Sequence, residues 1–190
     1  MSKSTRTNSK REAIIKAAIK LFSQQGVDGT SVKAIGEVAG VTDAALYKHF
    51  SSKSALAKAV FAYYADHYTQ LIDHYRKQSA PFDQRISDLI RGIVNNLDED
   101  HFGLLLLSQR HEWFVQIAQE HRLPLTAMTE LIADGIDSGA IPPQNPQLTA
   151  ALLIGALLRL AVFVENGVKL HTESNLEEIR KRMFGLIGLI

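Results

Sequence analysis

The residues best suited to bind another molecule open a short amphipathic segment near the amino terminus. Thr42 and Asp43 stand at its start, and Ala45 and Lys48 lie on the side opposite the apolar Leu46. Such an exposed helix start fits the major groove of DNA. There a threonine methyl group can contact thymine and a lysine can donate to guanine, whereas a carboxylate can only accept, most naturally from cytosine N4. We predict that these four exposed side chains contact base edges, although Asp43 can instead stabilise the helix dipole by about 0.3–1 kcal/mol.

Two short helices joined by a tight turn must position these side chains. Residues 32–39 carry apolar residues at helical spacing, and Gly40 permits the left-handed backbone that a sharp turn needs. Thr42 supplies an oxygen that can cap the second helix. Residues 30–53 therefore read as a helix-turn-helix.

A third helix must complete the core of this module, because two short helices cannot bury enough apolar surface alone. Ser9 and Glu12 form a capping box, and Gly26 closes the segment, which predicts a helix over 9–25. We expect one apolar core made by Phe22, Ile35, Val38, Leu46 and Phe50.

The charge distribution also favours DNA. The net charge of the chain is +1, but residues 1–60 carry ten Lys and Arg against four Asp and Glu, so the remaining residues, 61–190, are net acidic. A local cationic field raises association with a polyanion. An ordinary solvated basic surface is the alternative interpretation.

The 190 residues suffice for a small module on a larger helical body. We predict a disordered basic arm over 1–8, a DNA-binding domain over 9–52 and a second domain over 53–190. Cysteine is absent, which excludes disulfides and fits a cytoplasmic location. Residues 1–8 lack the apolar stretch of a signal peptide.

Helical spacing of apolar residues continues through the second domain, and nothing predicts a strand, so the predicted fold class is all-α. The first helix begins at Ser51 or Ser52 and runs for about 25 residues, enough to link the two domains mechanically. The other predicted helices cover 82–97, 101–107, 110–135 with a possible break before Pro124, 148–167 and 175–190.

The last two predicted helices carry more apolar surface than one small bundle can cover. We expect them to form a homodimer as a four-helix bundle, and a monomer that buries them internally is the alternative. The apolar tract 150–164 contains Arg159 and is shorter than the ~20 residues that span a bilayer. We interpret it as a buried helix and expect no membrane partner.

The chain resembles the tetracycline-repressor (TetR) family of bacterial transcriptional regulators over residues 9–60. The residues that carry the resemblance are 17–22 before Gly26, Thr30 with 34–36, 39–41, 46–50, and Ser52–Lys53 with Ala55–Leu56. The resemblance implies a nine-helix all-α homodimer with a small-molecule pocket in its carboxy-terminal domain.

The same resemblance implies which residues contact DNA phosphates: Thr30, Ser31, Tyr47, His49 and Lys53. Helix amino ends, hydroxyl groups and lysine are suited to that role. Tyr47 can instead fill the gap beside the following helix, and His49 can instead cap or pack. Asp43 departs from the family habit, which leaves the base assignments open.

An effector pocket would combine aromatic walls with a few polar groups. The candidate lining is Tyr64, Tyr68, Phe102, His111, Trp113, Phe114 and Arg159. Ordinary core packing is the alternative for each of these residues. Arg159 lies in an apolar tract and needs a partner, which an acidic effector, Glu165 or Asp137 could supply.

Nothing in the sequence predicts catalysis. His67 and His74 are seven residues apart on one helix, a poor spacing for metal ligands, and no serine lies at a strand-to-helix elbow. We therefore expect no metal, no cofactor and no enzymatic activity, although a small helical enzyme remains an alternative.

The resulting hypothesis is a dimeric regulator that binds an inverted-repeat operator in double-stranded DNA and is released by a small-molecule effector of unknown identity. Effector binding would move the long linking helix and change the spacing of the two recognition helices. The alternative from another class is a helical small-molecule-binding or dimer scaffold protein without a DNA role.

Overall fold

The computed structural model describes residues 3–108, 114–170 and 172–189, and these residues form helices and no strand. The all-α prediction is confirmed. The helices are α1 (Lys3–Gly29), α2 (Val32–Ala39), α3 (Asp43–His49), α4 (Lys53–Arg76), α5 (Phe82–Asp100), α6 (Phe102–Ser108), α7 (Phe114–Glu120), α8 (Pro124–Asp137), α9 (Pro146–Glu165) and α10 (Glu173–Ile187).

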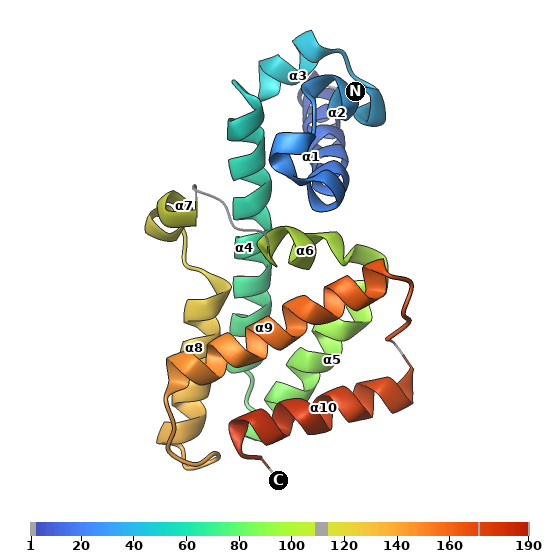
Figure 1. Ribbon diagram of the computed structural model, residues 1–190. Helices are drawn as coiled ribbons and strands as arrows, with labels where there is room; N and C mark the ends of the chain where they lie inside the picture. Colours follow the sequence, from blue (N-terminus) through green and yellow to red (C-terminus); the bar gives the residue numbers. More distant parts are fainter. Residues whose placement is uncertain (1–2, 109–113, 171, 190) are drawn as a thin grey trace.

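The chain forms two packed regions joined by one long helix (Figure 1). Helices α1, α2 and α3 gather at one end around the beginning of α4, and α4 continues into the region that holds α5 to α10. Ser52 caps α4 by accepting from the backbone N–H of Ala55. The predicted mechanical link is therefore one unbroken helix.

The small core of the first region is close to the predicted one. Phe22, Ile35, Leu46 and Phe50 are buried as expected, but Val38 is 54% exposed, so its assignment to the core is wrong. Helix α2 has only eight residues, and Val38 is exposed although Ile35, three residues before it, is buried. Over so few residues, helical spacing alone does not show which apolar positions face the core.

Helix α1 begins earlier than the capping box predicts. It starts at Lys3, so Ser9 lies inside the helix and most of the expected disordered arm is helical. Residues 3–8 contain no glycine or proline, and extending an existing helix needs no new nucleus. Gly26 interrupts the helix as expected, with φ 71° and ψ 166°, and allows the chain to turn towards α2.

The region predicted as one segment over 110–135 is two helices. Helix α7 ends at Glu120, and Pro124 occupies the first turn of α8, where its missing N–H leaves no hydrogen bond unmade. With this division the described residues form ten helices, against the nine that the resemblance implied.

Helix α9 is not the fully buried helix that its composition suggested. Ala150, Leu153, Leu157 and Ala161 are buried, while the opposite side faces solvent. Among the described residues, α9 is the one helix long and apolar enough to cross a membrane by length and composition, a property that core helices of soluble proteins share.

Candidate nucleic-acid interface and ligand cavity

The turn between α2 and α3 has the geometry that the sequence predicted. Gly40 is left-handed, with φ 65° and ψ 34°, and the backbone N–H of Val41 donates to the carbonyl of Gly36 at 2.9 Å. A Cβ atom on Gly36 would lie 2.8 Å from the Val41 carbonyl oxygen. A side chain at position 36 would therefore force α2 and the start of α3 to move apart.

The amino-terminal side of α3 is open to solvent. Thr42 caps the helix by accepting from the N–H of Ala45, which leaves the hydroxyl proton free to donate. Thr42 and Lys48 are exposed, and Ala45 is half-buried. These positions are compatible with the predicted base contacts, which remain predictions.

Asp43 has a more specific position than the sequence suggested. Its Oδ1 atom lies 3.3 Å from where a Cβ atom on Gly36 would stand, so the carboxylate is folded against α2. The residue is also in the first turn of α3, where a negative charge stabilises the helix dipole. This placement favours the dipole role over contact with cytosine.

Three of the predicted phosphate contacts are accessible. Ser31 is exposed and caps α2 by accepting from the N–H of Ala34. Tyr47 is 51% exposed, and His49 is half-buried. Their phosphate roles remain predictions, with Ser31 at a helix amino terminus in the most favourable setting.

The remaining two predicted phosphate contacts make internal hydrogen bonds. The Thr30 hydroxyl is buried and donates to the carbonyls of Leu21 at 3.3 Å and Gly26 at 2.8 Å, a position that disfavours the predicted phosphate contact. The Lys53 ammonium donates to the carbonyls of Asp28 at 3.3 Å and Thr30 at 2.9 Å. Both side chains hold the loop between α1 and α2.

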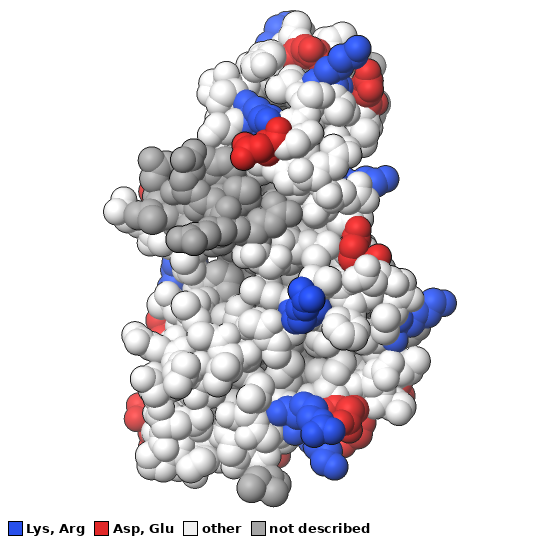
Figure 2. All heavy atoms as spheres, in the orientation of Figure 1, with Lys and Arg blue, Asp and Glu red and all other residues white. Residues whose placement is uncertain are grey.

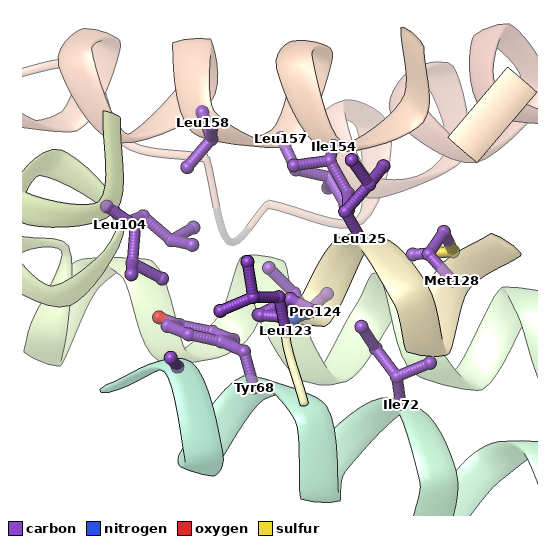
Figure 3. A pocket seen from close by; sticks show the side chains of 13 residues that line it. Tyr68, Ile72, Leu104, Leu123, Pro124, Leu125, Met128, Ile154, Leu157 and Leu158 are labelled. Atoms are coloured by element: carbon purple, nitrogen blue, oxygen red, sulfur yellow. The ribbon is translucent and has the colours of Figure 1, made fainter. Parts of the chain in front are cut away.

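A cavity of about 300 Å³ lies in the second region, between α4, α8 and α9 (Figure 3). Its lining is apolar apart from the phenol of Tyr68, and the complete set is Ala65, Tyr68, Ile72, Ile93, Leu104, Leu107, Leu123, Pro124, Leu125, Met128, Ile154, Leu157 and Leu158. A volume of this order accommodates a small organic molecule.

Of the four predicted lining residues whose side chains the structure describes, only Tyr68 lies in the wall of this cavity. Tyr68 lines the cavity, but Tyr64 donates its hydroxyl to Asp100, at 2.8 and 3.0 Å from the two carboxylate oxygens. Phe102 packs against the core, and Arg159 is exposed on the outer side of α9. His111, Trp113 and the side chain of Phe114 lie outside the described residues.

The two tyrosines remain neutral. Burial, followed by the negative charge of Asp100, raises the pKa of Tyr64 and of Tyr68 far above the ordinary value for tyrosine. Each phenol is therefore a hydrogen-bond donor at any physiological pH. The ring of Tyr64 also lies against Gly103, where a Cβ atom would stand 2.2 Å from the ring.

Sequence reasoning missed the aliphatic walls of the cavity. They come from five helices and from the loop before α8, and each residue is typical of a core position in its own helix. The one local signal is the run Leu123-Pro124-Leu125 at the predicted break. No local sequence pattern indicates that these aliphatic side chains surround an empty volume.

The outer side of α9 forms a largely uncharged face (Figure 2). Leu148, Leu152 and Phe163 are each more than half exposed on it, and Gly155 opens on empty space. Arg159 is exposed among them, without a contact to Glu165 or Asp137 in the described part of the chain. Exposed apolar faces of this kind are typical of subunit interfaces.

Glu165 instead pairs with His101, whose Nε2 atom lies 2.6 Å from the carboxylate. Among the described residues, no group of three or more His, Asp or Glu side chains could hold a metal ion. The spacing of His67 and His74 along α4 therefore has no metal-binding counterpart in that part of the structure.

Comparison with known proteins relates the first region to regulators. Residues 14–60 match the profile of "Bacterial regulatory proteins, tetR family". The chain is 26% identical over 156 residues to the uncharacterized HTH-type transcriptional regulator YhgD of Bacillus subtilis, covering 80% of this chain and 82% of YhgD. It is 28% identical over 151 residues to the HTH-type transcriptional regulator RutR of Escherichia coli K12, covering 76% and 70%.

The fold is shared with solved structures over nearly the whole chain. The transcriptional regulator FadR from Bacillus subtilis, solved in complex with stearoyl-CoA, superposes with a TM-score of 0.71 at 20% identity. The match covers 94% of this chain and 98% of FadR. At this identity the likeness establishes the architecture of both regions.

Proposed function

We propose that this chain, which belongs to the tetR family of bacterial regulatory proteins, is a dimeric repressor that a small molecule releases from its operator. The chain is a DNA-binding transcriptional regulator, and its relatives are regulators rather than enzymes. Release by an effector, the dimer and a cytoplasmic location are the parts that we infer.

One observation carries the proposal: a single continuous helix joins the DNA-reading module to the wall of a cavity. Helix α4 starts at Lys53, directly after the helix-turn-helix, and its residues Ala65, Tyr68 and Ile72 line the cavity. A molecule that fills the cavity can therefore change the position of α4 and, through it, of α3. This coupling lowers DNA affinity by the difference in effector affinity between the two states.

The outer face of α9 supports a homodimer, and we expect α10 to contribute to the same interface. Leu148, Leu152 and Phe163 recur at intervals that place them on one side of α9, opposite the buried residues. A second copy packed on this face would cover them and bring two recognition helices to one operator.

The cavity lining indicates the chemistry of the effector. A charged or strongly polar group inside the cavity would lose its water and find only the Tyr68 phenol as a hydrogen-bond partner, since the other described wall residues are apolar. The part of the effector that enters is therefore a hydrocarbon chain or ring. The B. subtilis FadR with stearoyl-CoA provides a precedent in a protein of the same fold.

DNase footprinting on the DNA upstream of the protein's own gene tests the proposal. We expect protection of an inverted repeat, strong dependence on salt, and loss of protection when dodecanoyl-CoA is added. Absence of a protected, salt-sensitive repeat would overturn the DNA role, and protection that no hydrophobic molecule relieves would overturn release by an effector. No observation favours the scaffold alternative.

A further inference from the structure

One side of α4 is held by a continuous series of polar contacts to the segment 120–134, which we call the α4 seam. Along α4 the participating residues follow one another at helical spacing, so they share one side of the helix. The contacts are Lys58–Glu120, Asp66–His121, Thr69 with the Arg122 carbonyl, Asp73–Arg122, Arg76–Glu130 and Arg76–Asp134.

Arg122 is at the centre of the α4 seam. Its guanidinium contacts both carboxylate oxygens of Asp73, at 2.5 and 3.1 Å, and also Glu130 at 2.6 Å. Its backbone carbonyl accepts from the Thr69 hydroxyl at 3.0 Å. A planar guanidinium held by two carboxylates fixes both distance and direction, which one flexible ion pair does not.

The residues directly after Arg122 form a wall of the cavity. Leu123, Pro124 and Leu125 all line it, in the loop that leads into α8. Figure 3 shows these side chains around the same space as Tyr68 and Ile72 of α4. The same short segment therefore faces the ligand space and holds α4.

The other end of α4 is attached to the DNA-reading module. Lys53, the first residue of α4, donates to the carbonyls of Asp28 and Thr30, directly before Ser31. Movement of α4 along or about its axis is thus passed to the amino terminus of α2. The α4 seam and Lys53 together form a chain of contacts from the cavity wall to the DNA-facing surface.

We propose that Arg122 is the residue through which filling of the cavity moves α4, so that it sets the strength of coupling between effector and DNA. The inference rests on the proposed function above. When the cavity fills, the Leu123–Leu125 wall moves outwards and carries Arg122 with it. Because Arg122 holds both Asp73 and Thr69, α4 follows, and the equilibrium shifts towards the state with lower DNA affinity.

The charges of the seam agree with this role. The pKa of Asp73 is lowered mainly by its hydrogen bond with Arg122, and the pKa of Arg122 is raised mainly by the same bond. Both groups remain ionised at neutral pH, so the ion pair does not depend on a change of protonation there. In our proposal the Asp73–Arg122 pair transmits movement of the cavity wall to α4 and does not act as a pH switch.

A double-mutant cycle tests the coupling without any ligand. Ile154→Trp places a large side chain in the cavity from the α9 wall and imitates occupancy. We expect this change to weaken operator binding about tenfold in the wild-type background and less than about twofold in the Arg122→Met background. Operator affinity is measured by fluorescence anisotropy on the footprinted duplex.

Matched variants separate coupling from simple destabilisation. Arg91→Met removes the 3.5 Å ion pair with Glu173, which joins α5 to α10 away from the cavity and α4, and should leave the response to Ile154→Trp unchanged. Asp73→Asn should reduce the response as Arg122→Met does, and Arg122→Lys should restore part of it. Thermal unfolding of each variant shows whether the fold is retained.

Each outcome decides between the two proposals. An equal response to Ile154→Trp with and without Arg122, or no response in the wild-type background, would overturn the role of Arg122. If the cycle behaves as expected while dodecanoyl-CoA leaves operator binding unchanged, the coupling stands and the hydrocarbon effector class fails. If the cycle behaves as expected and dodecanoyl-CoA also releases the wild-type protein from its operator, dodecanoyl-CoA should no longer release the Arg122→Met protein. It should still bind that protein in calorimetry.

Discussion

The ammonium group of Lys53 donates a 2.9 Å hydrogen bond to the backbone carbonyl of Thr30, which precedes the cap of the first DNA-reading helix. The first residue of α4 thereby fixes the loop that presents Ser31. The family resemblance implies that Lys53 contacts DNA. In this structure its side chain holds the loop that carries Ser31, a second predicted phosphate contact.

Replacing Lys53 by Met should weaken operator binding without changing its salt dependence. A lysine that neutralises a phosphate contributes about 0.9 to the slope of log affinity against log salt, whereas a lysine that holds a loop contributes none. Anisotropy titrations at several salt concentrations give this slope. A slope that falls by about one would return Lys53 to the phosphate contacts.

Gly36→Ala should disrupt the helix-turn-helix. The added methyl group would meet the Val41 carbonyl at 2.8 Å, and the backbone there is fixed by the hydrogen bond between the same two residues. We expect a loss of about 1–3 kcal/mol of stability and loss of operator binding. Gly29→Ala is the control, because its new Cβ atom would make an ordinary 3.7 Å contact with Gln25. Equal effects in thermal unfolding would contradict the steric argument.

Lys48→Ala should relax sequence preference at one base pair of each half-site. The side chain is exposed on α3, and one good base contact discriminates by about 1–3 kcal/mol. Binding to a set of operators with single substitutions measures the preference. Uniform weakening across all of them would place Lys48 on a phosphate instead.

Leu152→Glu should convert the dimer to a monomer. The side chain is 51% exposed in one chain, and a carboxylate at that position would be buried without a partner when two copies meet. Sedimentation velocity gives the oligomeric state. Gln147→Glu, an exposed position on another side of α9, is the control and should leave the dimer intact. A dimer that survives Leu152→Glu would exclude this face as the interface.

Asp73→Asn should lower stability at neutral pH and have little effect in acid. Hydrogen bonding with Arg122 lowers the pKa of Asp73 below its ordinary value of 3.8. A carboxyl group with a lowered pKa stabilises the folded state above its ordinary pKa, and this contribution is lost as the pH falls through the folded value. Denaturant unfolding of both proteins between pH 7 and about pH 3 should show the two curves converging. A difference that persists in acid would mean that Asp73 acts by packing.

The amino-terminal module was largely predictable because its signals are local. Gly40, the Thr42 cap and the buried Leu46 each depend on residues within one or two turns, and the structure has them as expected. The departures from expectation there concern contacts with other elements. Val38 is exposed because α2 is too short to define a broad face, and Thr30 is buried because Gly26 turns the chain back over it.

The cavity was not predictable from aromatic and charged residues. Tyr64 is used in a hydrogen bond to Asp100, Arg159 points outwards, and the walls are aliphatic side chains from separate helices. An unfilled volume results from how helices cross and how large their facing side chains are. No single segment of sequence contains that information.

The sequence by itself determined the helices, the helix-turn-helix and the long linking helix, because spacing, caps and turns act over a few residues. Only the tertiary structure decided which side chains remain free to bind. Folding brings Lys53 to the Asp28 and Thr30 carbonyls and Arg122 to Asp73, and it leaves an apolar cavity beside α4. These contacts join residues far apart in the chain, and their geometry depends on the packing of whole helices.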